Sequence, residues 1–458
     1  MKNLFLITVY LLLVPVSFGQ SIQQKLQQAY RQFEADSQLK HAVSSLYVIN
    51  AKTGEIVFDK NSQVGLAAAS TQKIITAATA FELLGKGYRY KTELGYDGKI
   101  KENRLDGDLY ITGTGDPTLG SWRWSSTKDS FVLQKWSEQI KRLNIKYIDG
   151  DIRIDNSKFT FNGIPDGWIW QDIGNYYGAG SYSLNWKENQ YDLKLKSGDT
   201  VGSQVKVLSP KDKYLNSNEL KTASKGTGDN AYIYYNNSIA GTIPISEKSF
   251  VISGAIIDPL SELRRDLLFF IWKNIHTNAM RDVYSEKWPG PDGIIKKFYT
   301  HYSPTLDSII YWFLKKSINL YGEALLKTFA YEKKGYGSTD SGVVIIKDFW
   351  KQKGLDEDEL NIYDGSGLSP LNRITTHAQV EVLKYAKTKD WFPYLYDALP
   401  EFNGMKMKSG TISDVKAYCG YQKANDGNEY IFSFIVNNYN GRNPDLINKM
   451  YKVLDNLK

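Results

Sequence analysis

The chain has 458 residues, of which 23% are charged, and its formal net charge is +7 at pH 7. The positive excess is spread along the chain without a Lys/Arg run, which argues against nucleic-acid binding. Cys419 is the only cysteine, so no intramolecular disulfide is possible, and the four histidines lack the spacing of metal ligands. We expect no metal or cofactor. The length is too great for a single core and predicts two or three domains.

Residues 1–19 have the pattern of an export signal peptide. Lys2 supplies a positive start, an apolar run follows over 4–14, and Ser17-Phe18-Gly19 is a small-x-small cleavage site. The apolar run is short for a bilayer-spanning helix, and no other segment comes close. We therefore expect an exported, periplasmic protein, soluble or loosely membrane-associated, without a transmembrane segment after cleavage. A retained N-terminal anchor is the alternative.

The first part of the chain predicts helices and strands, and the middle predicts strands. We expect a polar helix over 21–41 and strands over 45–50 and 55–59. The next helix opens at Ser70 and ends at Gly85. Its apolar positions predict burial: Ile74, Ile75, Ala78, Phe81 and Leu84. Residues 93–299 show short alternating strands between Gly, Asp and Asn turns, which predicts a β-rich insert.

Helices return after residue 300, where Ser303-Pro304 is a typical helix start. Near the end, strands over 415–421 and 430–437 join across Asn425–Asn428, which is a hairpin signal. A helix over 444–457 closes the chain. We expect residues 20–92 and 300–458 to share one sheet and to form a single discontinuous domain of the α/β (α+β) class.

Ser70 and Lys73 stand three residues apart, on one face of the predicted helix. The helix N-terminus favours developing negative charge at Ser70. A lysine deprived of solvent can lose its proton and activate a serine nucleophile. Ser-x-x-Lys occurs four more times, but only the Ser70 copy opens an apolar helix. The other copies are Ser37/Lys40, Ser125/Lys128, Ser203/Lys206 and Ser413/Lys416.

Two further motifs supply what a Ser–Lys hydrolase needs besides its nucleophile. In Ser317-Ile318-Asn319, which interrupts a helical stretch, the hydroxyl can relay a proton and the amide can hold substrate backbone. In Lys408-Ser409-Gly410-Thr411, the first two residues can bind a carboxylate and Gly410 lets substrate approach the backbone. The Thr411 N–H can join that of Ser70 as an oxyanion hole. Other copies of both motifs exist, but only these stand in this order within the flanking segments.

This ordered set resembles the superfamily of penicillin-binding proteins and serine β-lactamases. Within it, the chain is similar to class C low-molecular-mass penicillin-binding proteins, the D-alanyl-D-alanine carboxypeptidase/endopeptidases of the penicillin-binding protein 4 type. The 247 residues from Ser70 to Ser317 match the long insert of that branch. Four further stretches also match: Gly113–Pro117, Tyr176–Ala179, Ser253–Ala255 and Asp364–Leu368.

The resemblance implies a five-stranded antiparallel sheet flanked by helices and interrupted by the β-rich insert, which would form two small domains. It implies a serine D,D-peptidase acting on peptidoglycan stem peptides and cross-links, with β-lactams as covalent inhibitors and no cofactor. Ser70 would be the acylated nucleophile and Lys73 its base, and Ser317 with Asn319 would assist transfer and positioning. Lys408 with Ser409 would bind the terminal carboxylate.

The resemblance also implies that an aromatic/Asp group of the insert receives the diaminopimelate side chain of the stem. The nearest candidates are Trp170, Asp172 and Tyr177, and Trp168 is nearly as good. One departure concerns the segment before Lys408, which lacks the Gly-Thr-Leu sequence and the arginine usual in the family. It shortens one rim of the cleft and bears on substrate fit.

Two alternative functions remain at this stage. A β-lactamase would need a group that speeds deacylation, and no glutamate stands in a clear context for that role. It would also leave the insert unexplained. A wall-binding scaffold of low activity would fit the shortened rim. The three intact motifs argue against it, because a scaffold gains nothing from a buried, deprotonated lysine.

Overall fold

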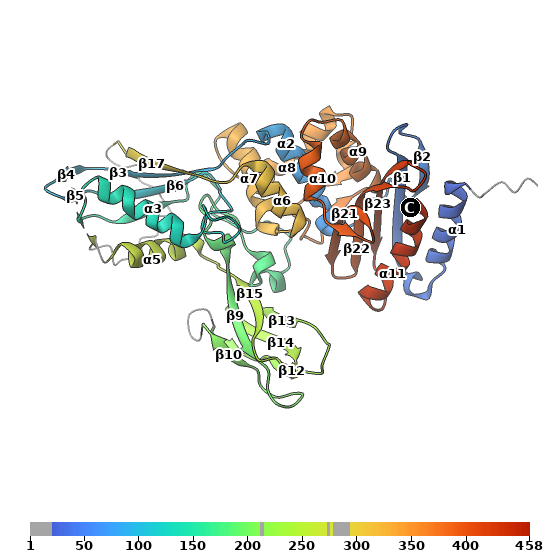
Figure 1. Ribbon diagram of the computed structural model, residues 1–458, viewed down its shortest axis with the longest axis horizontal. Coiled ribbons are helices and arrows are strands. Elements are labelled where there is room, and N and C mark those ends of the chain that lie inside the picture. The colour runs from blue at the N-terminus through green and yellow to red at the C-terminus, as the bar shows by residue number, and fades with distance from the viewer. Residues whose placement is uncertain (1–20, 211–214, 273–274, 278–293) are drawn as a thin grey trace, which may run out of the picture.

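The computed structural model describes residues 21–210, 215–272, 275–277 and 294–458 (Figure 1). The predicted export signal, residues 1–19, lies outside the described residues. In the described part of the chain, no helix has both the length and the apolar character needed to cross a membrane. The same residues contain no group of three or more His, Cys, Asp or Glu side chains placed to hold a metal ion.

The central sheet is built from both ends of the chain. Its antiparallel strands run in the order β2-β1-β23-β22-β21-β20. Their bounds are β1 (Val43–Asn50), β2 (Ile56–Lys60), β20 (Glu401–Phe402), β21 (Met405–Ile412), β22 (Val415–Lys423) and β23 (Glu429–Asn437). Strand β20 is one more than the expected five, because the short segment before Lys408 folds back on β21. The segments before and after the insert thus share one sheet.

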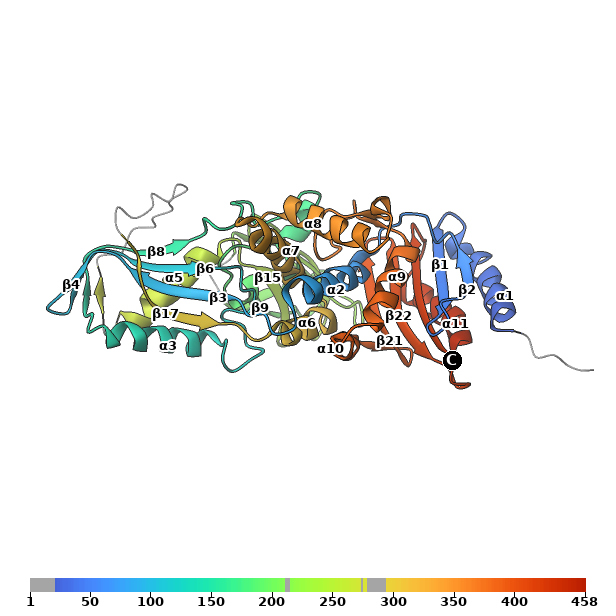
Figure 2. The same ribbon diagram turned by 90° about the horizontal axis from the view of Figure 1, so that it is seen from above.

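Helices cover both faces of this sheet (Figures 1 and 2). Successive side chains of a strand point to opposite faces, so β1 contributes to two cores. Leu46 and Val48 pack with α1 (Ile22–Glu34) and α11 (Asn443–Leu454). Tyr47 and Ile49 belong to the larger core on the other face. Helix α1 ends before the predicted residue 41, because Asp36 caps a separate 3-10 turn over 37–39.

The larger core is formed by a layer of six helices next to the sheet. They are α2 (Lys73–Leu84), α6 (Leu306–Lys315), α7 (Asn319–Lys334), α8 (Thr339–Gln352), α9 (Thr376–Lys387) and α10 (Phe392–Ala398). Ser317 separates α6 from α7 with a φ of 57°, which stops one helix and redirects the chain into the next. Helix α7 is buried along its first three turns, so it lies between the other helices and the insert.

The insert forms two bodies with separate cores. The first joins the part that contains the central sheet through β3 and β17, which pair antiparallel between Lys91 and Tyr302, just outside the predicted 93–299. It contains two helices that the strand-like sequence pattern did not predict. Its elements are β3 (Lys91–Tyr96), β4 (Lys99–Lys101), β5 (Arg104–Asp106), β6 (Leu109–Gly113), α3 (Asp129–Arg142), β7 (Tyr147–Ile148), β8 (Ile152–Asp155), α5 (Pro259–Ile271), β16 (His276–Thr277) and β17 (Lys296–Tyr302).

The second body hangs below the long axis of the molecule in Figure 1. Its strands surround a small core of aliphatic side chains and Tyr191. They are β9 (Gln190–Lys196), β10 (Lys206–Ser209), β11 (Ser217–Asn218), β12 (Lys221–Ala223), β13 (Asn230–Ile233), β14 (Ser238–Pro244) and β15 (Phe250–Ala255). A one-turn helix, α4 (Trp170–Ile173), and a 3-10 turn over 176–178 connect this body to α7.

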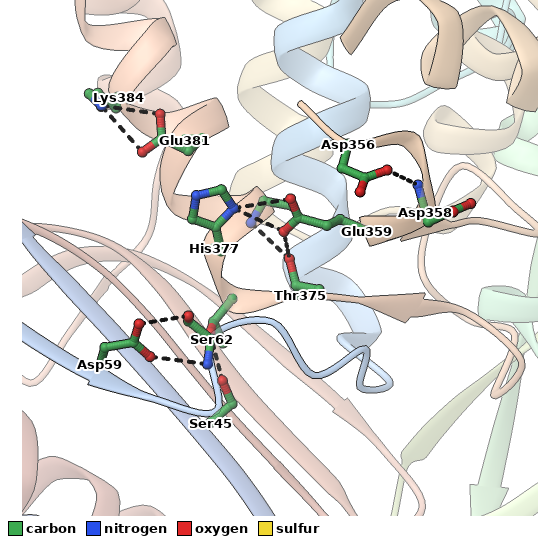
Figure 3. A network of polar contacts seen from close by, with 12 residues as sticks. Ser45, Asp59, Ser62, Asp356, Asp358, Glu359, Thr375, His377, Glu381 and Lys384 are labelled. Carbon is green, nitrogen blue, oxygen red and sulfur yellow. Dashed lines mark hydrogen bonds and ion pairs between the residues drawn. The ribbon is translucent and has the colours of Figure 1, made fainter. Parts of the chain in front are cut away.

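A polar network fixes the start of α9 to the loop that follows α8 (Figure 3). His377 Nδ1 lies 2.9 Å from Glu359 Oε2, and the Thr375 hydroxyl donates to the same carboxylate. Glu359 immediately precedes β18 (Leu360–Asn361), which pairs with β19 (Arg373–Ile374). The network therefore anchors both ends of the loop over 362–372, which reaches the candidate site.

We predict that His377 stabilises the fold in a pH-dependent way. The hydrogen bond to Glu359 raises the His377 pKa, and the Glu381 and Asp59 carboxylates act in the same direction. A raised folded-state pKa contributes stability below the unfolded value of about 6.5 and loses it as pH rises through the folded value. The unfolding free energy of His377→Gln should thus fall short of wild type by about 1 kcal/mol near pH 6. The gap should narrow by pH 8.5, as urea titrations can measure; a gap independent of pH would contradict a charged pair.

Candidate active site

Ser70 lies in a 3-10 turn, Ala69–Gln72, that leads directly into α2. The sequence predicted an α-helix from Ser70, but the tighter turn takes the first residues and α2 begins at Lys73. Ala69 has a φ of 47°, in the left-handed region that residues other than glycine rarely adopt. A backbone in such a conformation is strained and persists only where its surroundings fix it.

Two glycines let neighbouring segments fix this turn. A Cβ added at Gly367 would lie 2.0 Å from the Ala69 carbonyl oxygen, and one at Gly410 would lie 2.5 Å from that of Ala68. The Gly410 Cβ position is also 3.0 Å from Ser70 N. No larger side chain fits at either glycine without moving the backbone. Gly410, predicted to admit substrate, is thus in packing contact with the nucleophile turn.

The Lys73 amine is fully buried and has three polar neighbours. Its Nζ lies 3.0 Å from Ser70 Oγ, 2.7 Å from Asn319 Oδ1 and 2.6 Å from the Ser366 carbonyl oxygen. Burial lowers the Lys73 pKa to about 7, against the opposing charges of Asp364 and Glu323. A neutral amine has two N–H donors and one lone pair. Because the two carbonyl oxygens take the donors, the lone pair is left for the Ser70 hydroxyl proton.

Asn319 and Ser317 stand at the start of α7, on the cleft that also contains Ser70. The Asn319 amide is engaged at both ends: its oxygen accepts from Lys73 and its Nδ2 donates to the Tyr177 carbonyl at 2.8 Å. Its geometry suits positioning of Lys73 more than holding substrate. Ser317 faces the cleft, but no hydrogen bond joins its hydroxyl to Ser70 or Lys73 within the described residues.

Strand β21 places Lys408 below the cleft surface and Thr411 on it. Lys408 Nζ donates to the Ser409 carbonyl at 2.7 Å, and burial together with Lys73 holds the Lys408 pKa well below its usual range. Sequence reasoning passed over Lys416, which belongs to another Ser-x-x-Lys copy. Lys416 Nζ donates to Thr411 Oγ1 at 2.8 Å, and burial lowers its pKa to about 8.

The Asp364 carboxylate organises the loop that presents Ser366 to Lys73. It accepts from the Gly367 N–H at 2.7 Å, the Ser369 N–H at 2.6 Å and Trp168 Nε1 at 2.9 Å. Trp168 belongs to the insert, so the insert helps to hold this loop. In the sequence, Asp364 stands out only as part of a stretch that matches the family. Its role depends on a contact with Trp168, which lies 196 positions earlier in the chain.

Glu323 on α7 is a second buried titratable group near Lys73. Its Oε2 accepts from the Gly365 N–H at 3.1 Å. Burial, together with the Asp364 charge, raises the Glu323 pKa to about 8. The two groups oppose each other's shift, because the Glu323 charge raises the Lys73 pKa and the Lys73 charge lowers that of Glu323.

A buried ion pair of the insert forms another part of the cleft wall. Glu188 Oε1 accepts from Arg123 Nε at 2.7 Å, Ser121 Oγ at 2.6 Å and the Tyr321 hydroxyl at 2.8 Å. Tyr321 lies on α7, two residues after Asn319. Neither Arg123 nor Glu188 belongs to a recognisable motif, so no local signal in the sequence pointed to them.

The cleft has a volume of about 590 Å³. It is lined by residues from the segment before the insert, from the insert and from the segment after it. Of the insert residues predicted to bind substrate, Asp172 and Tyr177 line it. Burial raises the Asp172 pKa, which a hydrogen bond from Tyr177 partly offsets. Trp170 does not line the cleft: it is 59% exposed and stacks on Tyr234 outside it. Trp168 is buried against Asp364.

We predict that the reactivity of Ser70 rises with pH as Lys73 deprotonates. With a pKa of about 7, the acylation rate at pH 6 should be about one tenth of its plateau above pH 8. Acylation by a penicillin, followed by intact mass, measures this rate. Lys73→Ala should slow it at least about a hundredfold. Lys128→Ala, in an exposed Ser-x-x-Lys copy, is the matched control, and an equal loss there would contradict the assignment.

We predict that Gly410→Ala disables the nucleophile turn. The added methyl group would meet the Ala68 carbonyl and Ser70 N, so either the turn or β21 must move. Acylation of Ser70 should fall at least about tenfold, since small misplacements of reacting groups are costly. Gly87→Ala is the control, because nothing lies within 4 Å of its Cβ position. An unimpaired Gly410→Ala protein would show that the turn is not held in this way.

Comparison with known proteins places this chain in a family. The sequence model of the D-Ala-D-Ala carboxypeptidase 3 (S13) family matches residues 26–401. The D-alanyl-D-alanine carboxypeptidase of Actinomadura sp. (strain R39) is 26% identical over 445 residues, which cover 89% of this chain and 80% of that protein. D-alanyl-D-alanine carboxypeptidase DacB of Haemophilus influenzae is 25% identical over 354 residues, covering 74% and 70%.

A solved structure has the same fold. The crystal structure of penicillin binding protein 4 (dacB) from Haemophilus influenzae matches with a TM-score of 0.76 at 20% identity, covering 94% of this chain and 98% of that one. Its complex with a β-lactam gives a TM-score of 0.74. Because the family match spans most of the sequence, the chain belongs to the D-Ala-D-Ala carboxypeptidase 3 (S13) family and is a serine peptidase.

Proposed function

We propose that this chain is a periplasmic D,D-peptidase that cleaves peptidoglycan stem peptides at D-Ala-D-Ala termini, at D,D cross-links, or at both. The observation that carries the proposal is the buried Lys73 amine, which contacts Asn319 and Ser366 and lies 3.0 Å from Ser70 Oγ. Membership of the carboxypeptidase family supports the substrate class. The predicted signal peptide supports the location.

The first chemical step is acylation. Lys73 takes the Ser70 Oγ proton while Oγ attacks the carbonyl carbon of the penultimate D-Ala. The Gly410 Cβ position is 3.0 Å from Ser70 N, and Thr411, the next residue of β21, lines the same cleft as Ser70. We infer that the Ser70 and Thr411 N–H groups stabilise the oxyanion of the tetrahedral intermediate. Collapse breaks the C–N bond and leaves an ester on Ser70.

The leaving amine needs a proton, which the Lys73 ammonium can return through the Ser317 hydroxyl. Ser317 faces the cleft, and in the described structure no hydrogen bond joins its hydroxyl to Ser70 or Lys73. A bound substrate can therefore turn this hydroxyl toward Lys73 or toward the leaving amine. Water then attacks the ester, and Lys73 acts again as base. The products are the shortened stem peptide and free enzyme.

The terminal carboxylate of the substrate has a receptor on β21. Thr411 Oγ1 accepts from Lys416, so its own O–H is free to donate into the cleft. Lys408 and Ser409 lie next along the strand, and Lys408 adds positive potential when a carboxylate favours its charged form. At the opposite wall, the Asp172 carboxylate suits the amine of a diaminopimelate side chain.

Intact mass spectrometry with a penicillin tests the proposal. We expect the mature protein to gain one penicillin mass that persists, and Ser70→Ala to gain none. A peptide that ends in D-Ala-D-Ala should release D-Ala with wild type only. The β-lactam complex of the Haemophilus influenzae protein supports this choice of probe.

The other outcomes identify the alternatives. Rapid destruction of the penicillin without a lasting adduct would indicate a β-lactamase. A folded protein with neither adduct nor turnover would indicate a scaffold. A persistent adduct without D-Ala release, but with cleavage of cross-linked dimers, would assign the endopeptidase branch of the proposal.

A further inference from the structure

Four aromatic side chains of the insert form a shelf that continues outward from the cleft. They are Trp170, Tyr176, Tyr232 and Tyr234, and we call them the aromatic shelf. Tyr176 and Tyr232 line the cleft itself and are 51% and 44% exposed. Tyr234 is partly buried, and Trp170, 59% exposed, stacks on it with ring centroids 5.1 Å apart and an interplanar angle of 25°.

The backbone makes this arrangement rigid. Tyr232 lies on β13, and Tyr234 follows directly after its last residue, where its N–H donates to the Ser238 carbonyl at 2.8 Å. Asn175 Oδ1 accepts from the Ile233 N–H at 3.1 Å and ties β13 to the segment between Trp170 and Tyr176. A Cβ at Gly174 would lie 2.2 Å from the Ile233 carbonyl oxygen, so the two segments are in direct backbone contact.

The chemistry of the shelf selects a class of ligand. Asp172 is the only charged side chain in 169–178 and 230–237. Its carboxylate accepts a hydrogen bond from Tyr177. The remaining polar groups are amides and hydroxyls, including those of Gln171, Asn230 and Asn236. These two segments therefore contain no cation that could pair with a phosphate or an acidic peptide. The shelf suits a neutral polymer with hydroxyl and acetamido groups, whose sugar C–H faces pack on the electron-rich faces of aromatic rings.

We propose that the aromatic shelf binds the glycan strand to which the stem peptide is attached. This inference rests on the proposed function, because a stem peptide in the cleft carries its covalently linked glycan to the cleft mouth. The shelf begins inside the cleft, at Tyr176 and Tyr232, and ends outside it, at Trp170. An N-acetylated hexosamine seated on the exposed Trp170 ring, which Tyr234 supports from its other face, would therefore be continuous with the bound peptide.

The kinetic test compares a free stem pentapeptide with the same peptide on its N-acetylated disaccharide. Wild type should show a kcat/KM for the disaccharide form that is about tenfold higher, as expected for one stacked ring. Trp170→Ala should bring this ratio close to one, and Trp170→Phe should restore part of it. Trp272→Ala is the matched control, because Trp272 is 66% exposed on the other body of the insert. A ratio near one in wild type, or an unchanged ratio in Trp170→Ala, would overturn the proposal.

A binding test separates this proposal from the peptidase assignment. Peptide-free glycan strands are sedimented with Ser70→Ala protein, which cannot turn over a peptide. We expect co-sedimentation that Trp170→Ala reduces at least about fivefold and Trp272→Ala does not. Retention of binding by Trp170→Ala would refute the shelf even if the peptidase assay succeeds. If Ser70→Ala binds glycan but the wild-type protein forms no penicillin adduct, the result would support the shelf and contradict the peptidase assignment.

Discussion

The burial of one amine is the constraint on which this active site depends. Taking Lys73 out of water brings its pKa near 7, but a buried amine must still be given hydrogen-bond partners. Those partners are an amide oxygen from α7 and a carbonyl oxygen from the loop after β18. These two acceptors satisfy the two N–H groups of the neutral amine, and its lone pair is left to accept the Ser70 hydroxyl proton. The protonation state and the orientation of the base therefore follow from the same contacts.

The insert takes part in these contacts, although it supplies no residue of the three motifs. The Tyr177 carbonyl holds the Asn319 amide, and Trp168 holds Asp364, which shapes the Ser366 loop. Further along α7, Lys327 donates at 2.8 Å to the carbonyl oxygens of Asn162 and Ser181. The insert is thus a third wall of the base pocket. Its removal would expose Lys73 to water as well as removing a substrate surface.

How much could be predicted from sequence depends on how local the determinant is. Ser70 and Lys73 are one helical turn apart, and Cys419 sits in a plain strand pattern, so their spacing and burial could be predicted. The hairpin at Asn425–Asn428 was also a local signal, and β22 and β23 pair across it. By contrast, the 3-10 turn at Ser70 comes from packing against two distant glycines.

The determinants that could not be predicted from the sequence are contacts between residues that lie far apart in the chain. Arg123 and Glu188 matter through Tyr321, and Lys416 matters through Thr411, so no spacing rule finds either pair. The resemblance implied that Trp170 helps to receive the diaminopimelate side chain; in the structure it stacks on Tyr234 and does not line the cleft. Helices α3 and α5 escaped prediction because turn-rich strand patterns surround them. In each case tertiary contact outweighed local propensity.

The sharing of one sheet by the two ends of the chain has a consequence for when activity can arise during synthesis. Val43 pairs with Asn437, so the central sheet lacks a strand until almost the whole polypeptide has been made. Closing a loop of that length is slow compared with local folding, and until β21 is seated Gly410 cannot support the Ser70 turn. A nascent or truncated chain therefore holds its serine and lysine in an unassembled state. Hydrolytic capacity thus arises only when the sheet is completed.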